Sequence, residues 1–128
     1  MKDKLLKLHD YSYCPYSKFK VSAIVVMKDG REFFGVNVEN ASYGAAICAE
    51  RSAIVSAISA GYRKKDFKEL HVMVGNGSIG MPCFICRQVI SEMFSEDSFI
   101  YCYSTGGDVE KYTVRQLCPY PFGESDLL

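Results

Sequence analysis

Two short segments of the chain carry residue types that bind metals and move protons. Cys48 and Glu50 lie near the start of one predicted helix, and Cys83 and Cys86 begin the next one, directly after Pro82. Each segment alone is a weak signal, because a lone cysteine in an alanine-rich helix is usually a buried small hydrophobe and a C-x-x-C pair can be redox-active. Together they are more informative, since helix N-termini favour thiolates. Three protein ligands with one open position are typical of a catalytic zinc site.

Glu50 is badly placed to bind the same metal as Cys48. It follows Cys48 by two residues, which is about 200° around an ideal helix and only about 3 Å along it. A carboxylate there is suited to take a proton from the attacking water. The residues Cys14, Cys102 and His71 could supply a fourth, structural ligand, but none of them has paired spacing.

Two arginines lie next to the candidate ligands. Three thiolates give a zinc site a net negative charge, which makes the metal a weaker acid toward water. Arg51 follows Cys48 by three residues on the same helix face, and Arg87 adjoins Cys86. Guanidinium groups that donate to the sulfurs would withdraw charge and restore Lewis acidity. We therefore expect both arginines to contact the thiolates.

Composition excludes several other classes of protein. The 128 residues fit one domain, and 48% of them are hydrophobic, as in a globular core. Fifteen basic and fifteen acidic residues give a net charge of zero, which argues against binding to nucleic acid or to a membrane surface. The N-terminus has no secretory signal, so we expect a cytoplasmic protein whose six cysteines are thiols or metal ligands.

Hydrophobic periodicity predicts alternating helices and strands. In order, we expect a helix over 3–9, strands over 19–26 and 33–38, a helix over 45–60, a strand over 70–74, a helix over 83–94, a strand over 99–103, a turn at 106–107 and a helix over 113–117. Asp29-Gly30 between the first two strands is typical of a hairpin turn. The order indicates a mixed sheet with helices on its faces, a three-layer α/β domain.

The motifs resemble those of cytidine deaminases of the small, single-domain class. The matching segments occur in order over roughly residues 11–127 and comprise 15–19, 35–41, 48–51, 82–89 and 117–122. The resemblance implies a three-layer α/β/α fold with a mixed five-stranded sheet, and a homotetramer. It also implies one zinc ion per chain, held by Cys48, Cys83 and Cys86, and it supports Arg51 as a partner of the thiolates.

The resemblance assigns three residues to the pyrimidine base of a substrate. Glu50 would hydrogen-bond N3 of the pyrimidine and carry a proton to the leaving amine. The main chains of Ala49 and Met81 would contact the side of the exocyclic amine. The expected products are uridine or deoxyuridine and ammonia, a step of pyrimidine salvage.

Four further residues would recognise the rest of the nucleoside. Asn37 and Glu39 match the residues that bind the ribose 3′-hydroxyl, and their alternation on a strand puts both on one face. Phe19 would pack near the sugar and base, and Phe122 would reach the pyrimidine from a neighbouring subunit. Glu39 would also repel a phosphate, so we expect a nucleoside rather than a nucleotide as substrate.

The chain departs from the family pattern at the zinc motif. Phe84-Ile85 replaces the usual small pair between the last two cysteines, and Met81 stands where relatives often have Ser or Thr. One alternative is therefore a deaminase of another cytosine compound, such as a blasticidin-type antibiotic, against which Glu39 argues. A second alternative is a non-catalytic zinc-binding or ligand-binding module of the same fold, against which Glu50 argues.

Overall fold

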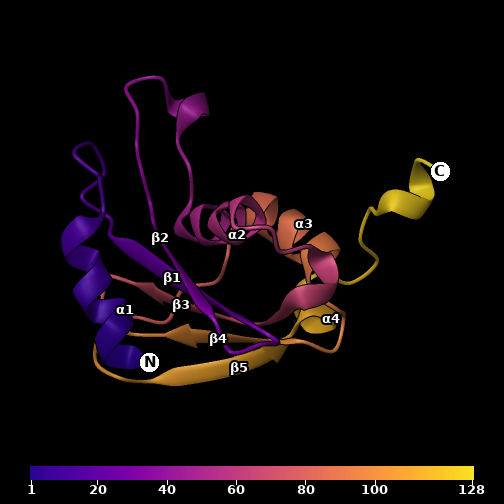
Figure 1. Cartoon of the computed structure of the whole chain (residues 1–128). Helices are drawn as coiled ribbons and strands as arrows, with labels where there is room; N and C mark the ends of the chain where they lie inside the picture. The colour runs from indigo at the N-terminus through magenta and orange to yellow at the C-terminus, as the bar shows by residue number, and fades with distance from the viewer.

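The computed structural model describes all 128 residues, and a mixed five-stranded sheet lies at its centre (Figure 1). The strands are β1 (Val21–Met27), β2 (Glu32–Val36), β3 (Phe67–Val74), β4 (Phe99–Tyr103) and β5 (Val109–Thr113). Their spatial order is β2-β1-β3-β4-β5, and only β3 and β4 run parallel to each other. The mixed five-stranded sheet that the family resemblance implied is confirmed.

Helices cover both faces of this sheet. They are α1 (Lys2–Leu8), α2 (Ala49–Ser59), α3 (Phe84–Met93) and α4 (Val114–Leu117), with 3-10 turns at His9–Tyr11, Tyr43–Ala45, Lys64–Asp66 and Glu124–Asp126. Figure 1 shows α2 and α3 together on one side of the sheet, and α1 packs on the other side. No helix in the chain combines the length and the apolar character that crossing a membrane requires.

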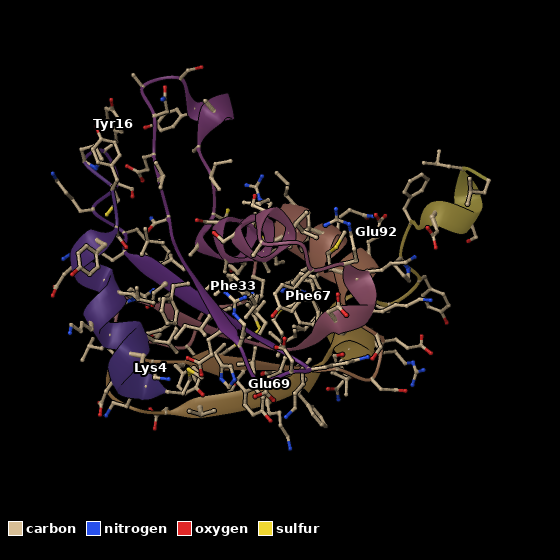
Figure 2. All side chains as sticks on the ribbon, in the orientation of Figure 1. Lys4, Tyr16, Phe33, Phe67, Glu69 and Glu92 are labelled. Carbon is tan, nitrogen blue, oxygen red and sulfur yellow. The ribbon has the colours of Figure 1, made fainter.

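Strand β1 is apolar except at Ser22, whose hydroxyl donates to the carbonyl of Leu5, because both of its faces are covered. Ala23 and Val25 belong to the larger core beneath α2 and α3, while Ile24 packs against Leu5 of α1 on the opposite face. Phe67 of β3 also lies in the larger core, in the layer between the sheet and the helices (Figure 2). A continuous hydrophobic run is the pattern expected for a strand buried on both sides.

The hairpin predicted at Asp29-Gly30 is present between β1 and β2. Gly30 has a φ of 92°, a left-handed conformation that glycine adopts without steric cost. Its N–H donates to the carbonyl of Met27 at 2.9 Å. The turn fixes the register of β2 against β1. Strand β2 then leads directly to Asn37 and Glu39.

The sequence pattern missed β5. Val109–Thr113 is an edge strand with three exposed and two half-buried residues, so it lacks the apolar signal of a covered strand. It pairs with β4 through an antiparallel ladder after the turn at Gly106-Gly107. Thr113 then caps α4, since its Oγ1 accepts from the N–H of Gln116 at 3.2 Å.

Helix α2 begins four residues later than the pattern predicted. Residues 43–45 form a 3-10 turn, and Ile47 then makes an isolated antiparallel bridge with Val38. This bridge holds the backbone extended until Cys48, which is the N-cap of α2. Cys83 is likewise the N-cap of α3, so the prediction that both cysteine segments lie at helix N-termini is confirmed.

The α2 backbone rests directly on β2 at Gly35. A Cβ at this position would lie 2.3 Å from the carbonyl oxygen of Ala49 and 2.4 Å from the amide nitrogen of Ala53. Both atoms belong to the backbone of the helix, so a rotamer change cannot relieve the overlap. The absence of a side chain at residue 35 therefore sets how closely the N-terminus of α2 approaches the sheet.

Substituting Gly35→Ala should push α2 away from the sheet. We expect the free energy of unfolding to fall by about 1–3 kcal/mol, as for other overpacked sites, and metal content to fall with it. Urea unfolding and metal analysis measure the two effects. Gly44→Ala is the matched control, because a Cβ there meets no atom within 4 Å. Equal stability of both variants would contradict the role of Gly35.

Candidate active site

The N-termini of α2 and α3 meet and bring three cysteine sulfurs together. The Sγ atoms of Cys48, Cys83 and Cys86 all lie within 4.8 Å of one another. Cys48 and Cys83 are the N-caps of their helices, and Cys86 follows in the first turn of α3. The N–H of Cys86 donates to Sγ of Cys83 at 3.5 Å, which fixes the orientation of that side chain.

The spacing of these sulfurs fits a zinc ion. Tetrahedral zinc with Zn–S bonds of about 2.3 Å requires neighbouring sulfurs to lie about 3.8 Å apart. The Sγ atoms of Cys48 and Cys83 are separated by 3.8 Å. Soft thiolate ligands select zinc over magnesium, calcium and manganese. The remaining cysteines, Cys14, Cys102 and Cys118, are not part of the cluster, so the cluster supplies three ligands and leaves a fourth position.

One of the two arginines contacts a sulfur, as predicted. Nη2 of Arg51 donates to Sγ of Cys48 at 3.4 Å. The pKa of Cys48 is lowered to about 5, first by its hydrogen bond with Cys86 and then by Arg51 and Cys83. Cys48 is therefore a thiolate at neutral pH, and Arg51 draws charge from it.

The expectation for Arg87 is wrong. Its guanidinium donates to two backbone carbonyls, those of Pro82 at 2.8 Å and Leu117 at 3.0 Å, and it stacks over the Phe84 ring. Adjacency in sequence misled the prediction, because residues 86 and 87 point to different sides of α3. Arg87 instead ties the start of α3 to the end of α4.

The Glu50 carboxyl is buried beside the sulfur cluster. Glu50 is only 5% exposed to solvent, and its Oε2 atom lies 3.8 Å from Sγ of Cys86. Burial raises the pKa of Glu50 to about 7, with a further contribution from the negative charge of Cys48. A carboxyl with a pKa near neutrality can both accept and release protons under physiological conditions, which is the property required of a general acid and base.

A cavity of about 270 Å³ opens beside the cluster and Glu50. Five of the predicted substrate residues line it, namely Phe19, Asn37, Glu39, Ala49 and Met81. Cys48, Glu50 and Cys83 line it as well. Sequence reasoning did not identify the other lining residues, which are Val21, Val38, Ala46, Ile47, Val74 and Gly80. These residues are apolar or small, so nothing in their type signalled a site.

The side chains of Asn37 and Glu39 are held in place by nearby backbone. Asn37 Oδ1 accepts from the N–H of Val21 at 2.9 Å, and Asn37 Nδ2 donates to the carbonyl of Phe19 at 2.7 Å. Glu39 accepts from the backbone N–H groups of Tyr16 and Ser17. Hydrogen bonding from Ser17 lowers the pKa of Glu39, so the carboxylate is ionised. Both side chains therefore present fixed polar groups to the cavity that they line.

Phe122 does not line the cavity of its own chain. It lies on the C-terminal segment after α4, which extends away from the sheet in Figure 1, and it is 56% exposed. Nε2 of Gln88 on α3 donates to its backbone carbonyl at 2.8 Å. The segment is thus anchored to the body of the protein while the Phe122 ring remains available to another molecule.

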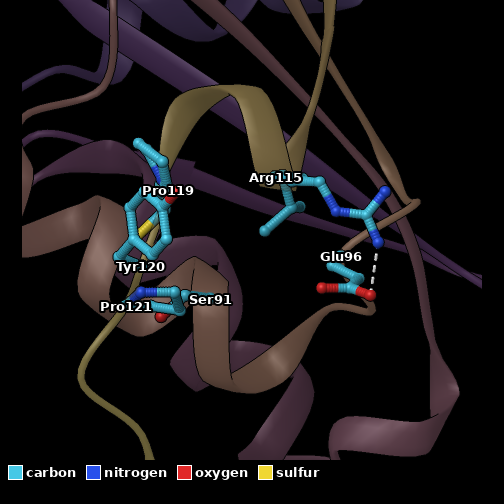
Figure 3. Close-up of a pocket in the computed structure, with 8 residues that line it drawn as sticks. Ser91, Glu96, Arg115, Pro119, Tyr120 and Pro121 are labelled. Atoms are coloured by element: carbon cyan, nitrogen blue, oxygen red, sulfur yellow. Dashed lines mark hydrogen bonds and ion pairs between the residues drawn. The ribbon is translucent and has the colours of Figure 1, made fainter.

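A second, larger cavity of about 670 Å³ lies between α3, α4 and the C-terminal segment. Figure 3 shows Arg115 paired with Glu96 at one side of it and Tyr120 between Pro119 and Pro121 at the other. Its polar side chains include no metal-binding cluster and no buried acid. The chemistry of the molecule therefore belongs to the smaller cavity.

A three-sulfur metal site with an open position and a buried carboxyl defines a zinc-dependent hydrolytic enzyme. Residues 1–102 match the family model "Cytidine and deoxycytidylate deaminase zinc-binding region". The chain is 40% identical to a cytidine deaminase of Sporosarcina psychrophila, over 94% of this chain and 88% of that protein. The chain belongs to the cytidine and deoxycytidylate deaminase family, and its metal is zinc.

Two further comparisons agree with this assignment. A cytidine deaminase of Halalkalibacterium halodurans is 38% identical over 95% of this chain and 91% of that protein. The crystal structure of cytidine deaminase from Burkholderia pseudomallei superposes with a TM-score of 0.89 at 39% identity, covering 94% of each chain. The likeness therefore extends over nearly the whole fold.

Removing a sulfur from the cluster should remove the zinc. We expect one zinc per chain in the purified protein and almost none in Cys86→Ala or Cys83→Ala, since two thiolates do not hold the ion firmly. Atomic absorption or mass spectrometry measures the stoichiometry. Cys118→Ala is the control, because that cysteine lies outside the cluster. Full zinc content in the Cys86→Ala protein would exclude Cys86 as a ligand.

Proposed function

We propose that the chain catalyses the zinc-dependent hydrolytic deamination of cytidine and deoxycytidine to uridine and deoxyuridine, with release of ammonia. The observation that carries this proposal is the set of residues that line one cavity. Two cysteines of the sulfur cluster and the buried carboxyl of Glu50 line it, and so do Asn37 and Glu39. The first group suits hydrolysis at a pyrimidine ring, and the second suits a sugar. In the cell the reaction would serve pyrimidine salvage in the cytoplasm.

Zinc held by Cys48, Cys83 and Cys86 would act as the Lewis acid that makes water a strong nucleophile at neutral pH. Glu50 would take one proton from this water and deliver it to N3 as oxygen bonds to C4. It would then move the second proton from that oxygen to the exocyclic amine. The C4–N bond breaks, ammonia leaves, and the C4 carbonyl of uridine remains.

Other groups of the chain would set the electrostatics and hold the base. Arg51 keeps part of the negative charge of Cys48 away from the metal, which preserves Lewis acidity. The main chains of Ala49 and Met81 would contact the side of the exocyclic amine, and both residues line the cavity. The Phe19 ring would pack against the nucleoside. Asn37 and Glu39 would bind the ribose 3′-hydroxyl.

Substrate comparison tests the proposed function. We expect cytidine and deoxycytidine to have similar kcat/KM values, and both CMP and cytosine to be poor substrates. A site built for a sugar hydroxyl can reject an analogue that lacks it by about 10⁴–10⁵-fold, and the ionised Glu39 repels a phosphate. Loss of absorbance on deamination follows each reaction. If CMP or cytosine matched cytidine, the sugar site would be misassigned.

Replacing Glu50 with its neutral isostere should abolish turnover without disturbing the metal. We expect Glu50→Gln to retain zinc and stability but to lose at least the roughly 10²–10⁴-fold that general acid and base catalysis contributes. Cytidine turnover, metal content and thermal unfolding are measured on the same preparation. Near-normal kcat in this variant would remove Glu50 from the proton transfers.

The proposed assembly is a homotetramer in which Phe122 reaches the pyrimidine in a neighbouring subunit. Its exposed ring and its absence from its own cavity support this arrangement. Phe122→Ala should lower kcat/KM in every subunit. Mixed oligomers of Phe122→Ala and Glu50→Gln chains should regain part of the activity, because some sites then combine an intact Glu50 with a neighbour's Phe122. An active monomer in sedimentation experiments would contradict the proposal.

A further inference from the structure

The turn at residues 15–17 donates hydrogen bonds to the Glu39 carboxylate. Backbone N–H groups of Tyr16 and Ser17 donate to Oε1 of Glu39 at 3.0 and 3.1 Å. The hydroxyl of Ser17 donates to Oε2. Figure 2 shows Tyr16 on the loop that projects beyond the end of the sheet. Three donors from one turn therefore hold a single carboxylate of a residue that lines the cavity.

These donors use most of the capacity of Glu39 to accept hydrogen bonds. A carboxylate has about four lone-pair positions, two on each oxygen. The two N–H groups fill both positions on Oε1, and Ser17 fills one on Oε2. One acceptor position remains, and it lies on Oε2 of a residue that lines the cavity.

Asn37 is limited in the same way. Its amide already donates one N–H to the carbonyl of Phe19 and accepts from the N–H of Val21. One N–H donor and one lone-pair position on Oδ1 are left. A hydroxyl group both donates and accepts, so the free N–H of Asn37 can donate to its oxygen while the free position on Glu39 accepts its proton.

The same turn also positions Phe19. The Ser17 hydroxyl oxygen accepts from the N–H of Phe19 at 3.0 Å, and Lys18 between them has a φ of 62°. A left-handed conformation at a residue other than glycine costs energy and persists only where surrounding contacts enforce it. Ser17 thus links the carboxylate of Glu39 to the backbone of an aromatic residue that lines the cavity.

We propose that Ser17 is a positioning residue for substrate specificity. It orients Glu39 and leaves this carboxylate a single free acceptor position, so that the enzyme recognises one sugar hydroxyl. This inference rests on the proposed function. It explains why a 2′-hydroxyl would be neither required nor rejected, since no acceptor on Glu39 remains for it. The turn, together with Asn37 and Glu39, would therefore determine how well the enzyme distinguishes nucleosides that have a 3′-hydroxyl from those that lack it.

The test compares kcat and KM for cytidine, 2′-deoxycytidine and 3′-deoxycytidine in the wild type, Ser17→Ala, Ser17→Thr and Ser42→Ala. The unmodified enzyme should lose at least about 10- to 100-fold in kcat/KM when the 3′-hydroxyl is absent, the effect of one lost hydrogen bond to a charged group, and more where the buried polar groups are left unpaired. Ser17→Ala should raise the KM for cytidine, change kcat less than about threefold, and reduce the loss for 3′-deoxycytidine to a few-fold. Ser17→Thr keeps the hydroxyl and should restore discrimination. Ser42 is an exposed loop serine whose side chain caps nothing, so Ser42→Ala should match the wild type.

The outcomes separate this inference from the proposed function. If wild-type enzyme fails to deaminate cytidine, the proposed function itself is wrong. If it deaminates cytidine and discriminates against 3′-deoxycytidine, but Ser17→Ala discriminates equally well, the role of Ser17 is overturned. A Ser17→Ala protein that loses kcat equally for all three nucleosides also overturns it, because that result indicates a general structural effect.

Discussion

The direct contact between the α2 backbone and strand β2 at Gly35 is the constraint on which the site depends. Strand β2 leads on to Asn37 and Glu39, while the N-terminus of α2 carries Cys48 and Glu50. Because no side chain separates the two elements at residue 35, backbone packing fixes where these two sets of residues, which line one cavity, lie relative to each other.

Local electrostatics shift the pKa values of Cys48 and Glu50, which lie close together, in opposite directions. The hydrogen bond with Cys86 and the guanidinium of Arg51 favour a thiolate at Cys48, whose pKa is lowered to about 5. Burial acts in the opposite direction on Glu50 and raises its pKa to about 7. Neighbouring groups with pKa values shifted apart in this way can take separate roles as metal ligand and proton carrier. Hydrogen bonds from the 15–17 turn lower the pKa of Glu39, which also lines the cavity, and keep it ionised.

Much of this arrangement could be predicted from the sequence because it follows local rules. The cysteine spacing and the predicted helix starts placed three ligands at two helix N-termini, and Asp29-Gly30 identified the hairpin. Strand β5 escaped because it is an exposed edge with little apolar signal. The late start of α2 depends on the bridge between Val38 and Ile47, which joins residues distant in sequence.

Other features of the site could not be predicted from the sequence, because they depend on where side chains point in the folded chain and not on their spacing in sequence. Arg87 adjoins a ligand in the chain but points to the carbonyls of Pro82 and Leu117. Ser17 lies 22 residues from Glu39 and meets it only in the fold. Most residues that family resemblance assigned to the cavity were found there because their motif fixes a whole local structure; Phe122 is the exception, since it does not line the cavity of its own chain.

The central claim is that two helix N-termini hold zinc through three thiolates and leave one position for the reacting water. X-ray absorption at the zinc edge of the purified enzyme tests it most directly. We expect three sulfur neighbours at about 2.3 Å and one oxygen neighbour at about 2.0–2.2 Å. Four sulfur neighbours would contradict it, because such a site is closed and structural and has no position at which water can be activated.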